Sequence, residues 1–374
     1  MADSMACQGR VAKMRKLMEE RGYDAVIVRD NASLRWLTGA ARAFDDETAH
    51  TAFVTADGLW LHTDSRYYET FVERLGEGTA WKVDMEPMPA AGFAAECIRQ
   101  SRARVVAIED TMDLAFFDRL ASEMSRKSVA CLLPRLHGDL TRLRMVKDEE
   151  ELALLRRAQE ITDDAFDHIC GFIHAGMTEL QIRAELESYM LSHGADALSF
   201  DSIIASGPNG AKPHALPGER VVGEGDLIVM DYGAGYCDYH ADMTRTVCVG
   251  HATDEERRVY DVVRAANEAC EAMAKAGVNG WDVHKMAEKV IGDAGYGEYF
   301  NHGLGHGVGI EIHEQPGFGR YFDAPIPAGS VVTVEPGIYL PGKFGIRLED
   351  TGVVLEDGYH PFGRSTHDLV EVGL

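Results

Sequence analysis

Two aspartates stand in a segment with the pattern of a β-hairpin, DLIVMDYGAGYCDYHADMTRT (226–246). Two β-rich runs flank a Gly-Tyr-Cys-Asp turn, and a hairpin centred near Tyr236 and Cys237 places Asp231 opposite Asp242. Directly opposed residues share a face, with Cβ atoms about 4.5–5.5 Å apart. Carboxylates this close repel each other, so either one stays protonated or cations neutralise them. The alternative is that one or both are solvated at strand ends or in the turn.

A glycine-rich segment supplies three histidines. In HGLGHGVGIEIHE (302–314), four glycines interleave with His302 and His306, and His313 follows seven residues later. Glycine lets the backbone approach a site closely while the imidazoles point into it. A lone histidine is more often a core or surface residue than a ligand, but three in twelve residues with this spacing favour a site.

Two glutamates extend the set. Glu335 ends the apolar run SVVTVEPG, where a buried ionised side chain is costly unless it is paired or metal-bound. Glu349 ends GIRLED two residues after Arg347, which puts both on one face of an extended strand. Either glutamate alone fits a solvent-facing edge position, whereas the whole set favours a common site.

The charge of this set predicts a dinuclear metal site. Four carboxylates and one neutral imidazole carry about −4, which two divalent cations balance, with room for a bridging hydroxide. Oxygen-rich ligation without a thiolate favours Mn²⁺, with Co²⁺, Fe²⁺ and Zn²⁺ as alternatives. Two such ions about 3.5–4 Å apart activate water near neutral pH and polarise a carbonyl, so the expected chemistry is hydrolysis. The predicted ligands are Asp231, Asp242, His306, Glu335 and Glu349.

Composition excludes several other classes. The chain has 374 residues and a formal charge of −24, which disfavours binding to nucleic acid or to anionic membranes. Its seven cysteines are scattered, which argues against a zinc ribbon or a disulfide scaffold. The first residues carry charges where a signal peptide needs apolar side chains, and no apolar run approaches 18 residues. We therefore expect a cytoplasmic protein with no membrane association.

The elements that must position the site fall into two predicted domains. Residues 1–140 alternate helical and extended patterns, with strands expected at 24–30, 52–63 and 104–110. They predict a modest α/β domain with a structural or substrate-gating role.

Residues 141–374 predict a larger α+β domain, because long helices accompany antiparallel strands. Three of its helices are expected to begin at capping boxes, Asp148 with Glu151, Thr178 with Gln181, and Thr253 with Glu256.

The ordered contexts MDYG, DMTRT, HGLGHGVG, TVEPG and IRLED resemble the pita-bread metallopeptidases (family M24), which include methionine aminopeptidase, aminopeptidase P and prolidase. The resemblance covers most of residues 150–374. More weakly, HTDSRYYETFVE (62–73) and KDEEELALLRRA (147–158) are similar to the creatinase/prolidase N-terminal domain. The resemblance implies an α+β fold: a C-terminal pita-bread domain preceded by a smaller α/β domain of the creatinase/prolidase type.

The resemblance also implies roles. Asp231 is expected to chelate one metal ion, and Asp242 and Glu349 to bridge both. His306 and Glu335 are expected to bind the other ion, with Glu335 also accepting a proton from the attacking water. Roles outside the ligand set are implied for His214, which would hydrogen-bond near the scissile amide, for His302 and His313, which would flank the substrate, and for Arg347, which would support the site.

Three features favour the proline-directed branch. Methionine aminopeptidases usually lack the large N-terminal domain, the first histidine of HGLGH and the arginine before the last ligand, all present here. Creatinases and histone-chaperone relatives have lost metal ligands, whereas this chain keeps all five. The expected activity is cleavage before proline in short proline-containing peptides, as an Xaa-Pro aminopeptidase or an Xaa-Pro dipeptidase, by a homodimer. The proton donor to the proline nitrogen is left open among His214, His302 and His313. A hydrolase with a non-proline substrate and a non-catalytic binding protein are the alternatives.

Overall fold

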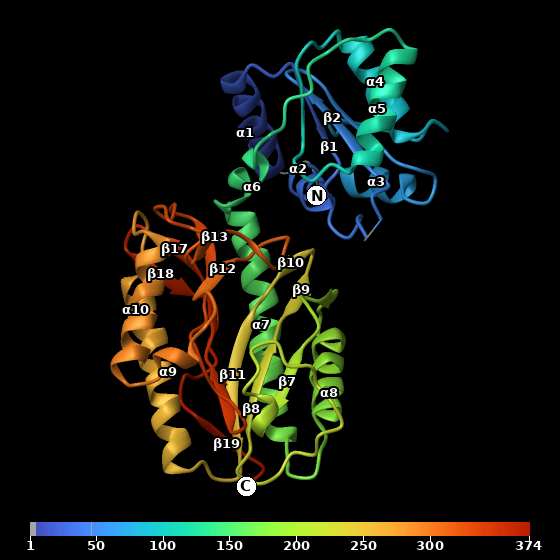
Figure 1. Ribbon diagram of the computed structural model, residues 1–374. Coiled ribbons are helices and arrows are strands. Elements are labelled where there is room, and N and C mark those ends of the chain that lie inside the picture. Colours follow the sequence, from blue (N-terminus) through green and yellow to red (C-terminus); the bar gives the residue numbers. More distant parts are fainter. Residues whose placement is uncertain (1–4, 46) are drawn as a thin grey trace. The chain divides into compact units, whose positions relative to one another are not determined.

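A computed structural model describes residues 5–45 and 47–374 of the chain (Figure 1). The chain divides into two compact units, Met1–Arg144 and Met145–Leu374. The division follows helix α6 (Asp139–Arg144), and the sequence-based division after residue 140 falls inside this helix. None of the described helices is both long and apolar enough to cross a membrane.

The first unit is built on a five-stranded sheet in the order β4-β3-β2-β1-β5. Strand β1, which lies between β2 and β5, runs antiparallel to β2 and parallel to β5. The strands are β1 (Ala25–Val28), β2 (Thr51–Thr55), β3 (Leu59–His62), β4 (Trp81–Asp84) and β5 (Val106–Ile108). The helices before α6 are α1 (Met5–Arg21), α2 (Asn31–Thr38), α3 (Tyr68–Leu75), α4 (Ala90–Ser101) and α5 (Leu114–Arg126).

One buried apolar cluster of the first unit lies between the sheet and helices α4 and α5. Ile27 and Phe53 of the sheet pack in one cluster with Ile98 of α4 and Leu120 of α5, and all four side chains are fully buried. In the described part of this unit, no three His, Cys, Asp or Glu side chains lie close enough together to hold a metal ion.

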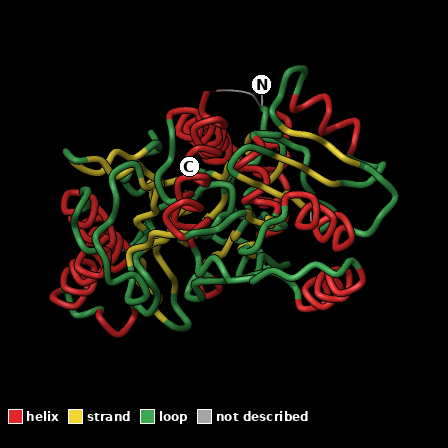
Figure 2. Tube along the Cα trace, turned by 90° about the horizontal axis from the view of Figure 1, so that it is seen from above, coloured by secondary structure: helices red, strands yellow, loops and turns green. Residues whose placement is uncertain are grey.

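Four long helices and four small sheets make up the second unit. In Figure 1, α9 and α10 lie on one side of the strands and α8 on the other, and Figure 2 shows yellow strands between red helices. The helices are α7 (Glu149–Phe172), α8 (Glu179–Ser192), α9 (Asp254–Met273) and α10 (Gly280–Asp293). Helices α7, α8 and α9 each begin at the predicted capping box, with both reciprocal hydrogen bonds formed.

The sheets of the second unit have the orders β19-β11-β8-β7, β13-β12-β14-β17-β18, β10-β9-β6 and β15-β16. Their strands before residue 300 are β6 (Ala197–Leu198), β7 (Ile203–Ser206), β8 (Leu227–Tyr232), β9 (Ala234–Tyr236), β10 (Tyr239–His240) and β11 (Met243–Val249). The later strands are β12 (Gly305–Gly307), β13 (Glu314–Phe318), β14 (Ser330–Val334), β15 (Gly337–Leu340), β16 (Phe344–Arg347), β17 (Asp350–Leu355), β18 (Gly358–Pro361) and β19 (Val370–Val372).

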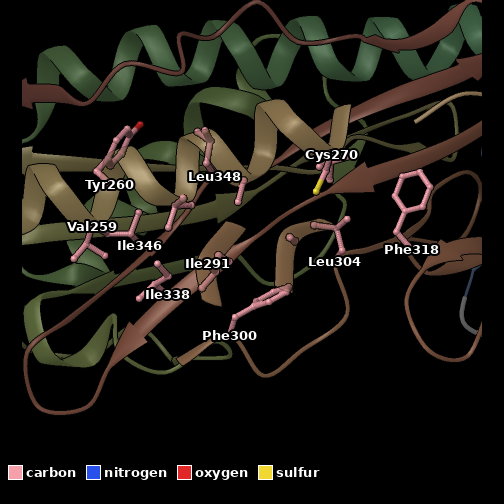
Figure 3. Packing of buried hydrophobic residues seen from close by; sticks show 14 of the residues in the cluster. Val259, Tyr260, Cys270, Ile291, Phe300, Leu304, Phe318, Ile338, Ile346 and Leu348 are labelled. Carbon is pink, nitrogen blue, oxygen red and sulfur yellow. The ribbon is translucent and has the colours of Figure 1, made fainter. Parts of the chain in front are cut away.

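An apolar core fixes the strands on either side of the metal-centre residues. Figure 3 shows Val259 and Tyr260 of α9 in the same buried cluster as Ile338 of β15 and Ile346 of β16. Leu348, between β16 and β17, also belongs to this cluster and is fully buried. The chain on both sides of Arg347 is thereby anchored, which limits the movement of the polar side chains that follow.

Candidate metal centre

The aspartate hairpin has a different register from the one the sequence suggested. Asp231 pairs with Thr244, and Tyr236 pairs with Tyr239, so the expectation that Asp231 lies directly opposite Asp242 is wrong. The central turn residues are Cys237 and Asp238, with φ of 49° and 66°. Positive φ at both positions is the geometry of a type I′ turn. Since side-chain direction repeats every two residues, this shift of two keeps Asp242 on the face of Asp231 as its diagonal neighbour.

Three further chain segments converge on Asp242 of this hairpin. Asp242 directly precedes β11, His306 lies within β12, Glu335 follows β14 and Glu349 precedes β17. His306 Nε2 lies 3.4 Å from Asp242 Oδ2 and 3.5 Å from Glu335 Oε1. One ligand atom each of Asp242, His306 and Glu349 lies within 4.8 Å of the others. This spacing suits coordination of a common cation.

Glycines let the histidine strand fit between its neighbours. A Cβ atom on Gly305 would lie 2.0 Å from the carbonyl oxygen of Thr333, and one on Gly307 would lie 2.8 Å from the backbone of Gln315. Strand β12 therefore approaches β13 and β14 closely only with glycine at these positions. The close packing fixes where the His306 side chain enters the site.

Arg347 connects the two ends of the carboxylate set. Its guanidinium forms an ion pair with Asp231, and its Nε donates a hydrogen bond to Thr244 Oγ1 at 3.0 Å. The Thr244 hydroxyl in turn donates to Glu349 Oε2 at 2.7 Å. Within the described part of the chain, Arg347 is the only arginine or lysine side chain that lines the cavity around these residues.

Every residue predicted for the site lines one cavity of about 490 Å³. The His306 and His313 rings lie 4.3 Å apart. Pro213, next to His214, accepts a hydrogen bond through its carbonyl from Arg347 Nη1 at 3.1 Å. The predicted residues that line the cavity are His214, Asp231, Asp242, His302, His306, His313, Glu335, Arg347 and Glu349.

The electrostatics of the cavity show an excess of carboxylate. Burial raises the pKa of Asp242 and of Glu349 well above the ordinary range, and neighbouring carboxylates raise both further. Burial also raises the pKa of Glu335 to about 8, although Arg347 opposes the shift. Burial lowers the pKa of His306 to about 4, so this imidazole is neutral at pH 7. One guanidinium therefore faces four carboxyl groups and a neutral histidine.

The donor set fits divalent cations. Asp231 Oδ1 and Glu349 Oε1 are buried and, within the described chain, have no hydrogen-bond partner, an arrangement that is costly without a compensating charge. His306 Nδ1 donates to the carbonyl of Gly307 at 3.0 Å, which leaves the Nε2 lone pair facing Asp242 and Glu335. Carboxylate oxygens with one imidazole nitrogen are ligands typical of first-row divalent metals.

Family comparison agrees with this chemistry. Residues 153–356 match metallopeptidase family M24, and residues 10–146 match the creatinase/prolidase N-terminal domain. The chain belongs to metallopeptidase family M24. The predicted fold, a pita-bread domain after a creatinase/prolidase-type domain, is thereby confirmed, and the protein is a metallopeptidase.

Relatives within the family span both units. An Xaa-Pro dipeptidase of Lactobacillus delbrueckii subsp. lactis is 39% identical over 361 residues, covering 96% of this chain and 97% of that protein. The solved Xaa-Pro dipeptidase from Bacillus anthracis has a TM-score of 0.90 at 30% identity, covering 98% of this chain and 100% of that one. The X-Pro aminopeptidase from Thermotoga maritima MSB8 has a TM-score of 0.87 at 34% identity, covering 97% and 100%.

Within this M24 site, the sequence analysis missed Tyr339. Its hydroxyl lies 3.0 Å from His302 Nε2 and accepts a hydrogen bond from Arg347 Nη1 at 3.0 Å. Gly337 pairs with Arg347 across β15 and β16, and a Cβ atom there would lie 2.6 Å from the Tyr339 hydroxyl. A glycine opposite the arginine, with a tyrosine two residues on, is the signal that indicates this contact.

A second polar cluster lies outside the cavity. Carboxylate and imidazole atoms of Glu271, Asp350 and His367 lie within 4.8 Å of one another. Asp350 Oδ1 accepts a hydrogen bond from Arg245 Nη2 at 2.8 Å, and Asp350 Oδ2 lies 2.7 Å from His367 Nε2. Asp350 is thus already paired with an arginine and a histidine, which distinguishes this cluster from the metal centre.

Proposed function

We propose that this metallopeptidase hydrolyses the Xaa-Pro bond of short proline-containing peptides and releases the residue before proline. The observation that carries the proposal is the cavity in which four buried or half-buried carboxyl groups and the neutral His306 face a single guanidinium. Full-length relatives named as an Xaa-Pro dipeptidase and an X-Pro aminopeptidase support the choice of proline substrates.

Two divalent metal ions, Mn²⁺ first and Co²⁺, Fe²⁺ or Zn²⁺ as alternatives, are proposed for the site. When bound, such ions lower the pKa of a water molecule and polarise the substrate carbonyl. Asp231 would hold one ion, and Asp242 and Glu349 would be shared between both. His306 and Glu335 would complete the second position, since their ligand atoms lie 3.5 Å apart.

Glu335 is proposed to accept the proton of the attacking water. Its backbone N–H donates to the carbonyl of Leu304 at 2.8 Å, and the Thr333 hydroxyl donates to its Oε1 at 3.3 Å. These contacts fix the carboxylate between the strands. A general base held in this way contributes because it is oriented before the substrate arrives.

Departure of proline requires a proton donor, since its ring nitrogen leaves a tertiary amide without an N–H. His302 Nδ1 donates to the carbonyl of Gly303 at 2.7 Å, and its Nε2 then accepts from the Tyr339 hydroxyl at 3.0 Å. Both ring nitrogens of His302 are engaged, so we assign it to orientation of the substrate. His214 and His313 are left as the proposed donors.

The deciding experiment uses metal-stripped protein with and without Mn²⁺ or Co²⁺. The panel contains Gly-Pro, Ala-Pro, Xaa-Pro-Xaa tripeptides and Met-Ala-Ser. Metal-dependent release of the first residue from the proline peptides alone is the expected result. The ratio of dipeptide to tripeptide rates distinguishes a dipeptidase from an aminopeptidase, both of which occur among the full-length relatives.

Failure to cleave any proline peptide, with metal bound by elemental analysis, would contradict the proposal. Cleavage of Met-Ala-Ser alone favours a hydrolase with a non-proline substrate, and no cleavage of any peptide favours a binding protein. The proposed homodimer is checked separately, by light scattering after size-exclusion chromatography.

A further inference from the structure

Arg245 of β11 is a buried arginine with every donor in use. Its side chain is 1% exposed. A guanidinium has five N–H donors, and five hydrogen bonds are formed here. The acceptors are the carbonyls of Thr244 (3.0 Å), Glu349 (2.6 Å), Ser365 (2.8 Å) and Thr366 (3.0 Å) and the carboxylate of Asp350 (2.8 Å).

Neighbouring residues of one strand hold Glu349 at two points. Thr244 points into the metal centre and donates its hydroxyl proton to Glu349 Oε2 at 2.7 Å. Arg245 projects from the opposite face of β11, as adjacent strand residues do, and donates to the main-chain carbonyl of Glu349. Glu349 N–H also donates to the carbonyl of Thr244 at 3.1 Å. Both the side chain and the backbone of this ligand are therefore fixed by β11.

The segment 364–367 contacts the Arg245 guanidinium and is itself held in place by other residues. Asp163 of α7 accepts hydrogen bonds from the N–H groups of Arg364 and Ser365, both at 3.1 Å. His367 Nε2 lies 2.7 Å from Asp350 Oδ2. This anchoring presents two main-chain carbonyls to Arg245 in a fixed position, so the guanidinium has a rigid support away from the metal centre.

We propose that Arg245 is a positioning residue for the metal centre, which sets the affinity for metal by fixing the backbone of Glu349 against the segment 364–367. The inference rests on the proposed function, because it takes Glu349 as a ligand. A lysine keeps the charge but offers only three donors, without the planar fork, so it cannot reproduce five hydrogen bonds.

The test is calorimetric titration of Mn²⁺ into metal-stripped wild-type protein and the Arg245→Lys variant. We expect affinity to fall about 10–100-fold, as for other residues that orient metal ligands. Arg29→Lys is the matched control, since Arg29 is 8% exposed and pairs with Asp113 at 3.0 Å in the first unit. This control is expected to leave Mn²⁺ affinity unchanged. Circular dichroism establishes that each variant unfolds cooperatively before it is titrated.

A second variant tests the contribution of the segment 364–367, which supplies two of the carbonyl acceptors of Arg245. Asp163→Ala releases the segment 364–367 and leaves the Arg245–Asp350 ion pair in place, so we expect a smaller loss of Mn²⁺ affinity in the same direction. Wild-type affinity in both folded variants overturns the inference alone. Absence of Mn²⁺ binding in the wild-type protein overturns the proposed metal centre, and the inference with it.

Discussion

Glu349 and Asp350 are consecutive buried carboxylates that belong to two clusters of opposite character. Glu349 belongs to the metal-ligand cluster, with Asp231, Asp242, His306, Glu335 and Arg347. Asp350 belongs to the ion-pair cluster, with Arg245, Glu271 and His367. Burial on its own would raise the pKa of both residues, but the neighbouring charges shift the two pKa values in opposite directions. Asp242 raises the pKa of Glu349 further, whereas Arg245 and His367 lower that of Asp350 to about 2.

The difference shows that burial alone does not mark a metal site. In the ion-pair cluster, Asp350 has a guanidinium at 2.8 Å, and burial raises the pKa of Glu271 to about 8, so Glu271 is largely protonated at pH 7. This cluster is balanced without a metal ion. The metal-ligand cluster, in contrast, has one arginine for four carboxyl groups. Such an imbalance is stable only with protons or cations.

The largest expected effect comes from one substitution made in both clusters. Burial raises the pKa of both Glu335 and Glu271 to about 8, so Glu335→Gln and Glu271→Gln are matched changes. We expect Glu335→Gln to lower kcat by about 10²–10⁴-fold, the usual contribution of a general base. Glu271→Gln is expected to leave kcat within about twofold, since Glu271 does not line the cavity. Initial rates on Ala-Pro at saturating Mn²⁺ measure both.

Equal losses in the two variants would contradict the separation of the clusters. A normal rate in Glu335→Gln would remove Glu335 from the proposed mechanism and leave the water without its assigned proton acceptor.

The next effect is on stability. Asp350→Asn removes the charge that balances Arg245 in a pair whose side chains are 1% and 2% exposed. Breaking a buried pair by removing one partner costs about 3–5 kcal/mol of unfolding free energy. Urea denaturation followed by circular dichroism measures the loss. Asp64→Asn, in the exposed Arg66–Asp64 pair, is the control and is expected to change stability far less, because exposed ion pairs contribute little.

A smaller effect is expected at the residue that joins Arg347 to Glu349. Thr244→Val keeps the shape but removes the hydroxyl that accepts from Arg347 Nε and donates to Glu349 Oε2. Leaving these buried groups unpaired costs about 1–3 kcal/mol in the metal-free protein. The loss should be smaller with Mn²⁺ bound, because a bound cation compensates the carboxylate. An equal loss with and without Mn²⁺ would argue against Glu349 as a ligand.

Local signals predicted much of this molecule. The capping boxes at Asp148, Thr178 and Thr253 form as expected because both hydrogen bonds of each box lie within four consecutive residues. The hairpin register failed for a physical reason. Cys237 and Asp238 both adopt positive φ, but neither of them is a glycine or an asparagine, so the turn lacks its usual sequence signal.

The long-range contacts could not be predicted from the sequence. Arg245 reaches acceptors more than 100 residues away, at Glu349, Ser365 and Thr366, and Tyr339 of β15 meets His302, which lies in a loop 37 residues earlier. No spacing rule connects residues so far apart in the chain. The contrast between Glu349 and Asp350 was hidden for the same reason, since the sequence shows two consecutive acids and not the cations each of them meets.

The smallest expected effect is a pH dependence that distinguishes protons from metal ions. The raised pKa of Glu335, about 8 against an ordinary 4.5, means that the folded metal-free protein binds more protons than the unfolded chain between these values. Its contribution to stability is complete below pH 4.5 and is lost as pH rises through 8. The pKa values of His302 and His306 are lowered from an ordinary 6.5 to about 4. These two histidines therefore reduce stability as the pH falls below 6.5, and they do not contribute to the change above it.

We therefore expect the Tm of metal-stripped protein to fall by roughly a few degrees between pH 6.5 and 8.5. Glu271 and Glu109, whose pKa values burial raises to about 8 and 7, contribute with the same sign. The difference between wild type and Glu335→Gln removes the contributions of Glu271 and Glu109, which both proteins share, and leaves that of Glu335 together with its effect on the pKa of Asp242 and Glu349. Mn²⁺ should reduce that difference, because cations replace the protons at this carboxylate. A difference unchanged by Mn²⁺ would place Glu335 outside the metal-ligand cluster.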